Sequence, residues 1–278
     1  MKLSCLPVSF FAELAAGRMP IAEWAQMAAR LGLDGIDLSI AWIADRSPAG
    51  LAALRRQIED AHMRVVMLTS YTDFTHPDPA ERARAVADGE AIVGVAAALG
   101  AELLRVTAGQ GRPEVGRDEG IAWAVAGLRN LAERTVGSGV TLAYENHSKP
   151  GVWTYTDFCE PPDIFREIAA GVEGTGIGIN FDVGNAATFS DDPVALLDAV
   201  LPRVVSIHAS DSATRGKLKH VLLGTGITPY PALFGRLVRG GWDRWICMEE
   251  ASYQGVPGIA AAAKFVRATW AAAQAAAG

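Results

Sequence analysis

The sequence has 278 residues, of which half are hydrophobic and one fifth are charged, so the chain is long enough to bury a large core. Its formal net charge is −6, and no long basic run or basic-aromatic patch occurs, which argues against a nucleic-acid-binding protein. The cysteines Cys5, Cys159 and Cys247 are scattered and form no C-x-x-C pair, so we expect small buried side chains and no disulfide framework.

Two apolar stretches could be mistaken for targeting or membrane segments. Residues 1–17 faintly resemble a signal peptide, but Glu13 interrupts the apolar run and no A-x-A cleavage site follows. The stretch 91–104 is too short and too interrupted by glycine to span a bilayer. We therefore expect a cytoplasmic protein with no membrane partner.

Short β-type runs alternate with longer, alanine-rich amphipathic stretches along the whole chain. The eight expected strands are residues 2–7, 35–40, 64–69, 102–107, 140–145, 177–182, 204–209 and 245–250. Eight strands, each followed by a helix, predict an α/β protein with a single (β/α)₈ TIM barrel, in one domain over residues 1–278. A doubly wound open sheet is the alternative, but it would want a glycine-rich phosphate turn after the first strand, and "LPVSFFAELAAG" is not one.

The last four expected strands share a pattern of alternating faces. Successive side chains of a strand point to opposite sides, and here one face carries bulky apolar residues while the other ends in an ionisable group. These four groups are Glu145, Asp182, His208 and Glu249. In a barrel they meet at the catalytic mouth. The same alternation places Glu250 on the opposite face, with Met248.

Three crowded carboxylates would repel one another and force protonation of at least one of them. A divalent cation removes this cost, and His208 can add a neutral nitrogen ligand. The set of three oxygens and one nitrogen favours one Mn²⁺ ion, with Mg²⁺, Co²⁺ and Zn²⁺ as alternatives. The competing interpretation is a polar barrel end with ordinary ion pairs, for example to Arg105.

At these positions the chain resembles the xylose isomerase-like TIM-barrel superfamily, the sugar phosphate isomerase/epimerase family. The motifs that carry the resemblance are "YENH", "NFDVGN", "IHASD" and "MEEAS", with "AALGAELLRV" in support. The resemblance covers essentially the whole chain and implies that Glu145, Asp182, His208 and Glu249 hold the metal. Many epimerase-like members have a histidine where this chain has Asn185, which cannot titrate near neutral pH. The endonuclease branch has an aspartate where this chain has Leu218, which argues against DNA repair.

The resemblance and the quartet together predict a divalent-metal-dependent isomerase or epimerase of a sugar or keto-polyol. Glu145 and Glu249 would transfer the proton as base and acid, through a metal-stabilised enediolate. A metal-dependent lyase or dehydratase, like the inosose and dehydroshikimate dehydratases, is the alternative. Asn185 and the unusual loop 148–162 keep that alternative open. A non-catalytic sugar-binding barrel is a third interpretation, which the complete ligand set argues against.

Other side chains near the expected mouth are candidates for contacts with a small carbohydrate or polyol substrate. These are His147, Asn185, Arg215, His220, Trp42 and Tyr71. Loop histidines, solvated charges and aromatic core packing are the competing explanations. Asp211 is a candidate for support of the site, in a position behind the ligands.

Three further features are ambiguous in the sequence. The turn "LGTG" (223–226) could cradle a phosphate, although a plain turn is favoured. Asp37 and Arg105 fall on the inner faces of their strands, where an ion pair between them is favoured over substrate contacts. A homo-oligomer and phosphorylation of the substrate are left open.

Overall fold

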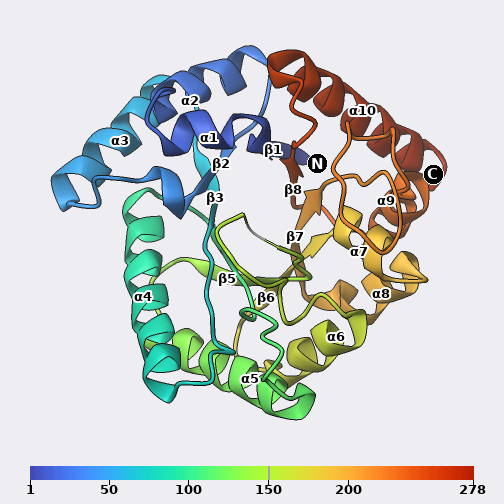
Figure 1. The fold of residues 1–278 in the computed structure, drawn as a ribbon. Helices are drawn as coiled ribbons and strands as arrows, with labels where there is room; N and C mark the ends of the chain where they lie inside the picture. Colours follow the sequence, from blue (N-terminus) through green and yellow to red (C-terminus); the bar gives the residue numbers. More distant parts are fainter. Residues whose placement is uncertain (150) are drawn as a thin grey trace.

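Eight parallel strands form a nearly closed barrel inside a ring of helices (Figure 1). The computed structural model describes residues 1–149 and 151–278. All eight expected strands are confirmed, with ends that differ by at most one residue. They are β1 Lys2–Leu6, β2 Ile36–Ser39, β3 Val65–Thr69, β4 Leu103–Val106, β5 Thr141–Glu145, β6 Gly178–Asp182, β7 Val204–Ala209 and β8 Trp245–Glu249.

The helices cover the outside of the barrel. They are α1 Phe11–Ala15, α2 Ile21–Arg30, α3 Pro48–Asp60, α4 Pro79–Ala98, α5 Arg117–Arg134, α6 Pro162–Gly171, α7 Val183–Phe189, α8 Pro193–Val200, α9 Tyr230–Arg239 and α10 Gly255–Ala275, with short 3₁₀ turns η1 Val8–Phe10, η2 Ile40–Trp42 and η3 Leu201–Arg203. Several begin with proline after a polar cap, as α3 does after Ser47 and α8 after Asp192. Gly100 and Gly241 follow α4 and α9 at positive φ, where a side chain would be strained.

The barrel has one seam, between β1 and β2. The ladder runs β1-β8-β7-β6-β5-β4-β3-β2, and within the described residues no ladder joins its two ends. At the seam, the Asp34 amide donates to the Leu3 carbonyl at 2.8 Å and the Ser4 hydroxyl donates to Asp37 at 2.7 Å. The first and second strands are therefore linked by isolated bonds instead of a regular ladder.

The inside of the barrel changes from apolar to polar along its axis. Between the N-terminal ends and the middle of the strands, a small buried cluster contains Met67, Leu103, Trp245 and Cys247. Toward the C-terminal ends the inner side chains are polar and buried, and they lead up to the mouth. The three cysteines are buried and free, as expected. Within residues 1–149 and 151–278, no helix has both the length and the apolar character that a membrane crossing requires.

Candidate metal centre

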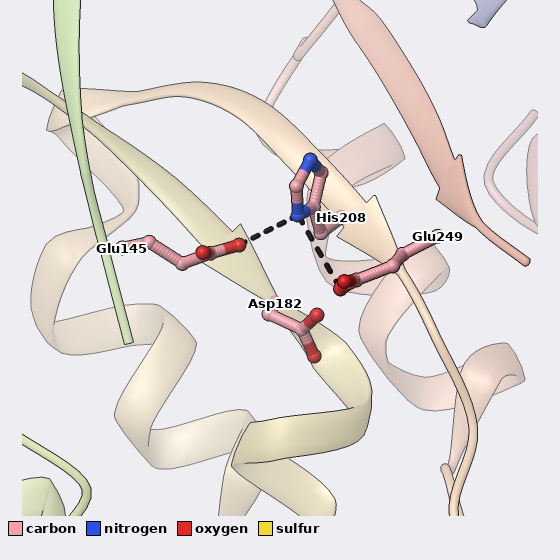
Figure 2. Close-up of side chains that lie close together, drawn as sticks. All are labelled: Glu145, Asp182, His208 and Glu249. Atoms are coloured by element: carbon pink, nitrogen blue, oxygen red, sulfur yellow. Dashed lines mark ion pairs between the residues drawn. The ribbon is translucent and has the colours of Figure 1, made fainter. Parts of the chain in front are cut away.

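Four side chains at the C-terminal ends of β5, β6, β7 and β8 converge in the mouth of the barrel (Figure 2). Glu145, Asp182, His208 and Glu249 each offer one ligand atom, and these atoms all lie within 4.8 Å of one another. Parallel register brings the strand ends together. Asp182 pairs with His208, Glu145 pairs with Asn180 two residues before Asp182, and Cys247, two residues before Glu249, pairs with His208. The predicted meeting of these four residues is therefore observed.

Hydrogen bonds hold both oxygens of Glu145 and one oxygen of Asp182. Glu145 Oε2 accepts from Arg105 Nη1 at 2.7 Å, and its Oε1 accepts from Asn180 Nδ2 at 2.8 Å. Asp182 Oδ1 accepts from the Ser210 hydroxyl at 2.8 Å and from the amide of Asn185 at 2.6 Å. Asp182 Oδ2 is buried and has no partner in the described chain.

The other two ligands have fewer partners. His208 Nδ1 lies 2.6 Å from Glu145 Oε1 and 3.7 Å from Glu249 Oε2. Neither ring nitrogen makes a hydrogen bond of acceptable geometry with the residues that the structure describes. The Glu249 side chain is 21% exposed, and no N–H or O–H group of the described chain donates to it.

The protonation of the cluster supports the same interpretation. Burial raises the pKa of Asp182 well above its usual range, and the charges of Glu249 and Glu145 raise it further. Burial would lower the pKa of His208, but the facing Glu145 outweighs it and raises this pKa to about 9. The raised pKa values favour the protonated forms of Asp182 and His208 in the metal-free chain, and a divalent cation at this cluster would compete with those protons. The donor set fits such an ion, and the cluster could hold one.

Asn146 links β5 to the backbone of Asp182, a role that was not predicted from the sequence. Its side-chain Nδ2 donates to the Asp182 carbonyl at 2.8 Å, and its Oδ1 accepts from the Asp182 amide at 2.8 Å. The side chain thus acts as one more rung between β5 and β6, beyond the last backbone pair of Glu145 and Asn180. Asn180 was also missed, although it shares the inner face of its strand with Asp182.

The predicted ion pair between Asp37 and Arg105 is wrong. Arg105 extends to Glu145 instead, and its guanidinium carbon lies 5.2 Å from the centre of the Tyr71 ring. Asp37 accepts from the Ser4 hydroxyl and, at 3.2 Å, from the Met67 amide. Burial raises the pKa of Asp37 to about 6. The long arginine side chain reaches a carboxylate on the adjacent strand β5, whereas β3 separates it from Asp37.

A known family matches most of the chain. Residues 25–269 fit the family described as xylose isomerase-like TIM barrel. The chain belongs to this family. One relative is the rhizopine catabolism protein MocC of Rhizobium meliloti, 29% identical over 151 residues, which are 48% of this chain and only 44% of that protein. Another is the "Putative hydroxypyruvate isomerase" of Streptomyces coelicolor, 26% identical over 246 residues, which are 83% of this chain and 85% of that protein.

Several solved structures share the fold at low sequence identity. A D-tagatose 3-epimerase-like protein has a TM-score of 0.80 and 16% identity, with full coverage of both chains. The "probable 3-DHS dehydratase AsbF" of Bacillus anthracis has a TM-score of 0.77 and 17% identity, covering 96% of this chain and 99% of that one. The IolI protein with a bound zinc atom has a TM-score of 0.77 and 15% identity, covering 100% and 99%. These three structures show that the chain shares their fold along its whole length.

Two of the predicted substrate contacts lie beside the quartet. His147 follows Glu145 by two residues, is 8% exposed, and has its Nδ1 3.3 Å from Asp157 Oδ2. Asn185 donates its Nδ2 to the Asn146 carbonyl at 3.1 Å, while its buried Oδ1 has no partner in the described chain. Both side chains are thus oriented by a neighbour, and Asn185 keeps a free acceptor.

The aromatic candidates differ in their surroundings. The Tyr71 hydroxyl lies 2.9 Å from Ser39 Oγ. The Tyr71 ring also contacts Arg105, the residue that forms the ion pair with Glu145. Trp42 is 5% exposed and packs edge-on against Phe11 at 5.4 Å, which is a core contact.

The polar candidates of the loop after β7 make contacts within the loop or to the neighbouring one. Arg215 Nη1 donates to the Ser190 carbonyl at 3.0 Å. His220 is half-buried and pairs with Ser212 through an isolated backbone bridge. Asp211 is buried and accepts backbone N–H groups of its own loop. Within the described chain, none of these three side chains belongs to the group of four whose ligand atoms lie within 4.8 Å of one another.

Proposed function

We propose that this chain is a divalent-metal-dependent isomerase or epimerase of a sugar or keto-polyol, in one cytoplasmic domain. The observation that supports it most is that four potential ligand atoms lie within 4.8 Å of one another at the mouth of a barrel of the xylose isomerase-like family. Glu145, Asp182, His208 and Glu249 would hold the ion. Mn²⁺ is our preferred ion, and the zinc atom of IolI keeps Zn²⁺ as an alternative. The hydroxypyruvate isomerase and the epimerase-like relatives support this class of reaction.

A bound divalent ion would supply positive charge that polarises the carbonyl of the substrate. Glu249 is the group we assign to removing the proton from the neighbouring carbon, because it is partly exposed and accepts no hydrogen bond from the described chain. Glu145, fixed by Arg105 and Asn180, faces it and completes the acid–base pair. Asn185 Oδ1 is a free acceptor for a substrate hydroxyl.

The test compares two neighbouring glutamates. Glu249→Gln and Glu250→Gln are isosteric and adjacent, but only Glu249 belongs to the quartet. The Mn²⁺-loaded protein is incubated in D₂O with a panel of ketoses and inososes, and products are identified by NMR. We expect deuterium incorporation without loss of water, a rate loss of about 100-fold or more for Glu249→Gln, and most of the rate retained for Glu250→Gln. Equal losses in both variants would contradict the assignment.

The second candidate is a dehydratase that uses the same site. The observation that favours it is Asn185, which stands where an epimerase-like histidine would and is anchored to Asn146. Loss of a β-hydroxyl from the same enolate would then replace return of the proton. A product that has lost water in the same NMR screen would establish the dehydratase and refute the isomerase.

A further inference from the structure

The loops after β7 and β8 each contain a buried carboxylate directly beyond the strand. Asp211 is 1% exposed and Glu250 is fully buried. In TIM barrels these two loops, together with a helix N-terminus, commonly form the binding site for a substrate phosphate. Such a site depends on free backbone N–H groups directed at the anion. Whether these N–H groups are free therefore decides whether a phosphate can bind there.

Asp211 occupies the amide groups of the loop after β7. Its Oδ2 accepts from the amides of Gly224 and Gly226, both at 2.9 Å. Its Oδ1 accepts from the amides of Ser212 at 3.0 Å and Thr228 at 3.1 Å. Four N–H groups thus surround one carboxylate, as they would surround an anionic ligand. The N–H groups of Gly224 and Gly226 in the glycine-rich turn 223–226 are therefore already bound by the Asp211 carboxylate.

The remaining amides of this turn are also engaged. The Thr225 amide donates to the Leu222 carbonyl at 3.0 Å, and the Ile227 amide donates to the Ser212 carbonyl at 2.9 Å. The cationic candidate of the same loop, Arg215, is turned to the Ser190 carbonyl and lies 3.8 Å from the carboxylate of Asp191. No amide from Gly224 to Thr228 is left for a ligand.

Glu250 has the same role in the loop after β8. Its Oε1 accepts from the Ser252 amide at 2.9 Å, and its Oε2 accepts from the Ser9 hydroxyl. The same hydroxyl accepts from the Tyr253 amide at 2.8 Å. The carboxylate lies against the first turn of α10, because a Cβ added to Gly258 would be 3.2 Å from Glu250 Oε1. The positive end of this helix is thus neutralised from within.

We propose that the substrate of this protein carries no phosphate group. A phosphate held at either loop would lie against a carboxylate that already accepts from the nearby N–H groups. A buried like-charge contact of this kind is strongly unfavourable. Asp211 and Glu250 are therefore specificity-determining residues that exclude phosphorylated sugars. The inference rests on the proposed function for the class of substrate, a ketose or keto-polyol, and narrows that class to its unphosphorylated members.

The first test uses matched substrates. Each ketose that the wild-type, metal-loaded protein converts is compared with its terminal phosphate monoester, and all products are counted, whether isomerised, epimerised or dehydrated. We expect kcat/KM for the ester to be lower by about 100-fold or more. An ester that reacts as fast as the free sugar would overturn the inference. A dehydrated product from the free sugar alone would overturn the isomerase proposal and leave this inference standing.

The second test needs no turnover. Inorganic phosphate is titrated into the wild-type chain after removal of divalent ions, and the amide resonances of Gly224, Gly226 and Ser252 are followed by NMR. We expect no saturable shift below about 10 mM phosphate, because these N–H groups already donate to carboxylates. A saturable shift of these amides with a Kd below about 1 mM would overturn the inference.

Discussion

Replacing Arg105 by methionine should destabilise the metal-free protein more than the metal-loaded protein. The guanidinium lies 2.7 Å from Glu145, and the two side chains are 4% and 1% exposed. Methionine keeps most of the apolar stem and removes the charge. In the variant, Glu145 therefore stays buried and keeps one charged neighbour, His208, at 2.6 Å.

The size of the effect follows from this burial. Breaking a buried ion pair by removing one partner costs about 3–5 kcal/mol. Because His208 still faces Glu145, we expect the lower end, about 3 kcal/mol, which corresponds to a Tm lower by about 6 °C for a chain of 278 residues. A divalent ion in the centre would supply new positive charge beside Glu145. The Tm difference between variant and wild type should therefore shrink when the ion is present.

Scanning calorimetry with EDTA and with saturating Mn²⁺ measures both quantities. Arg105→Lys is the matched control, because it keeps a positive charge and should lose less than half as much Tm as the methionine variant. The reasoning would be refuted by a Tm loss below about 2 °C for Arg105→Met in EDTA. It would also be refuted by a loss of the same size with and without the ion.

Three further outcomes are expected. The pKa of His208 is raised to about 9 in the metal-free centre, so below that pH the ion must displace a proton from this side chain. Apparent metal affinity should therefore rise about tenfold per pH unit from pH 6 to 8. Calorimetry in buffers of different ionisation enthalpy measures both the affinity and the released proton. Asn146→Ala removes both hydrogen bonds to the Asp182 backbone, so it should lower the free energy of unfolding in urea by about 2–3 kcal/mol and weaken metal binding. Unchanged metal affinity in this variant would show that Asn146 does not position Asp182. Asp211→Ala should lower the free energy of unfolding by about 3 kcal/mol and speed hydrogen exchange at the Gly224 amide. A Gly224 amide that stays protected in this variant would contradict the role of Asp211 in the loop.

The strands and the quartet were predictable because they depend on local periodicity. Alternation along a strand decides which side chains point inward, and parallel strands place their C-terminal ends at one mouth. The choice of Glu249 over Glu250 needed only this alternation, and the structure places the two on the expected sides. These features require no knowledge of how distant segments pack.

The contacts that failed to follow from the sequence depend on long side chains and closed loops. Arg105 lies on the inner face as expected, but its flexible stem can reach several carboxylates, and only packing selects Glu145 over Asp37. Asn146 stands at a strand end, where a side chain that replaces a backbone rung has no sequence signature. Asp211 gathers amides up to 17 residues away, so its role appears only once the loop is folded.

The seam between β1 and β2 sets where the barrel can open. Amides on the facing edges of these strands have isolated bonds instead of a ladder, so local opening and hydrogen exchange should begin there. Continuous ladders join β5, β6, β7 and β8, the strands that carry the quartet. These strands are separated from the seam by β1 on one side and by β2, β3 and β4 on the other. Local opening between β1 and β2 can therefore occur while the four residues of the quartet keep their spacing.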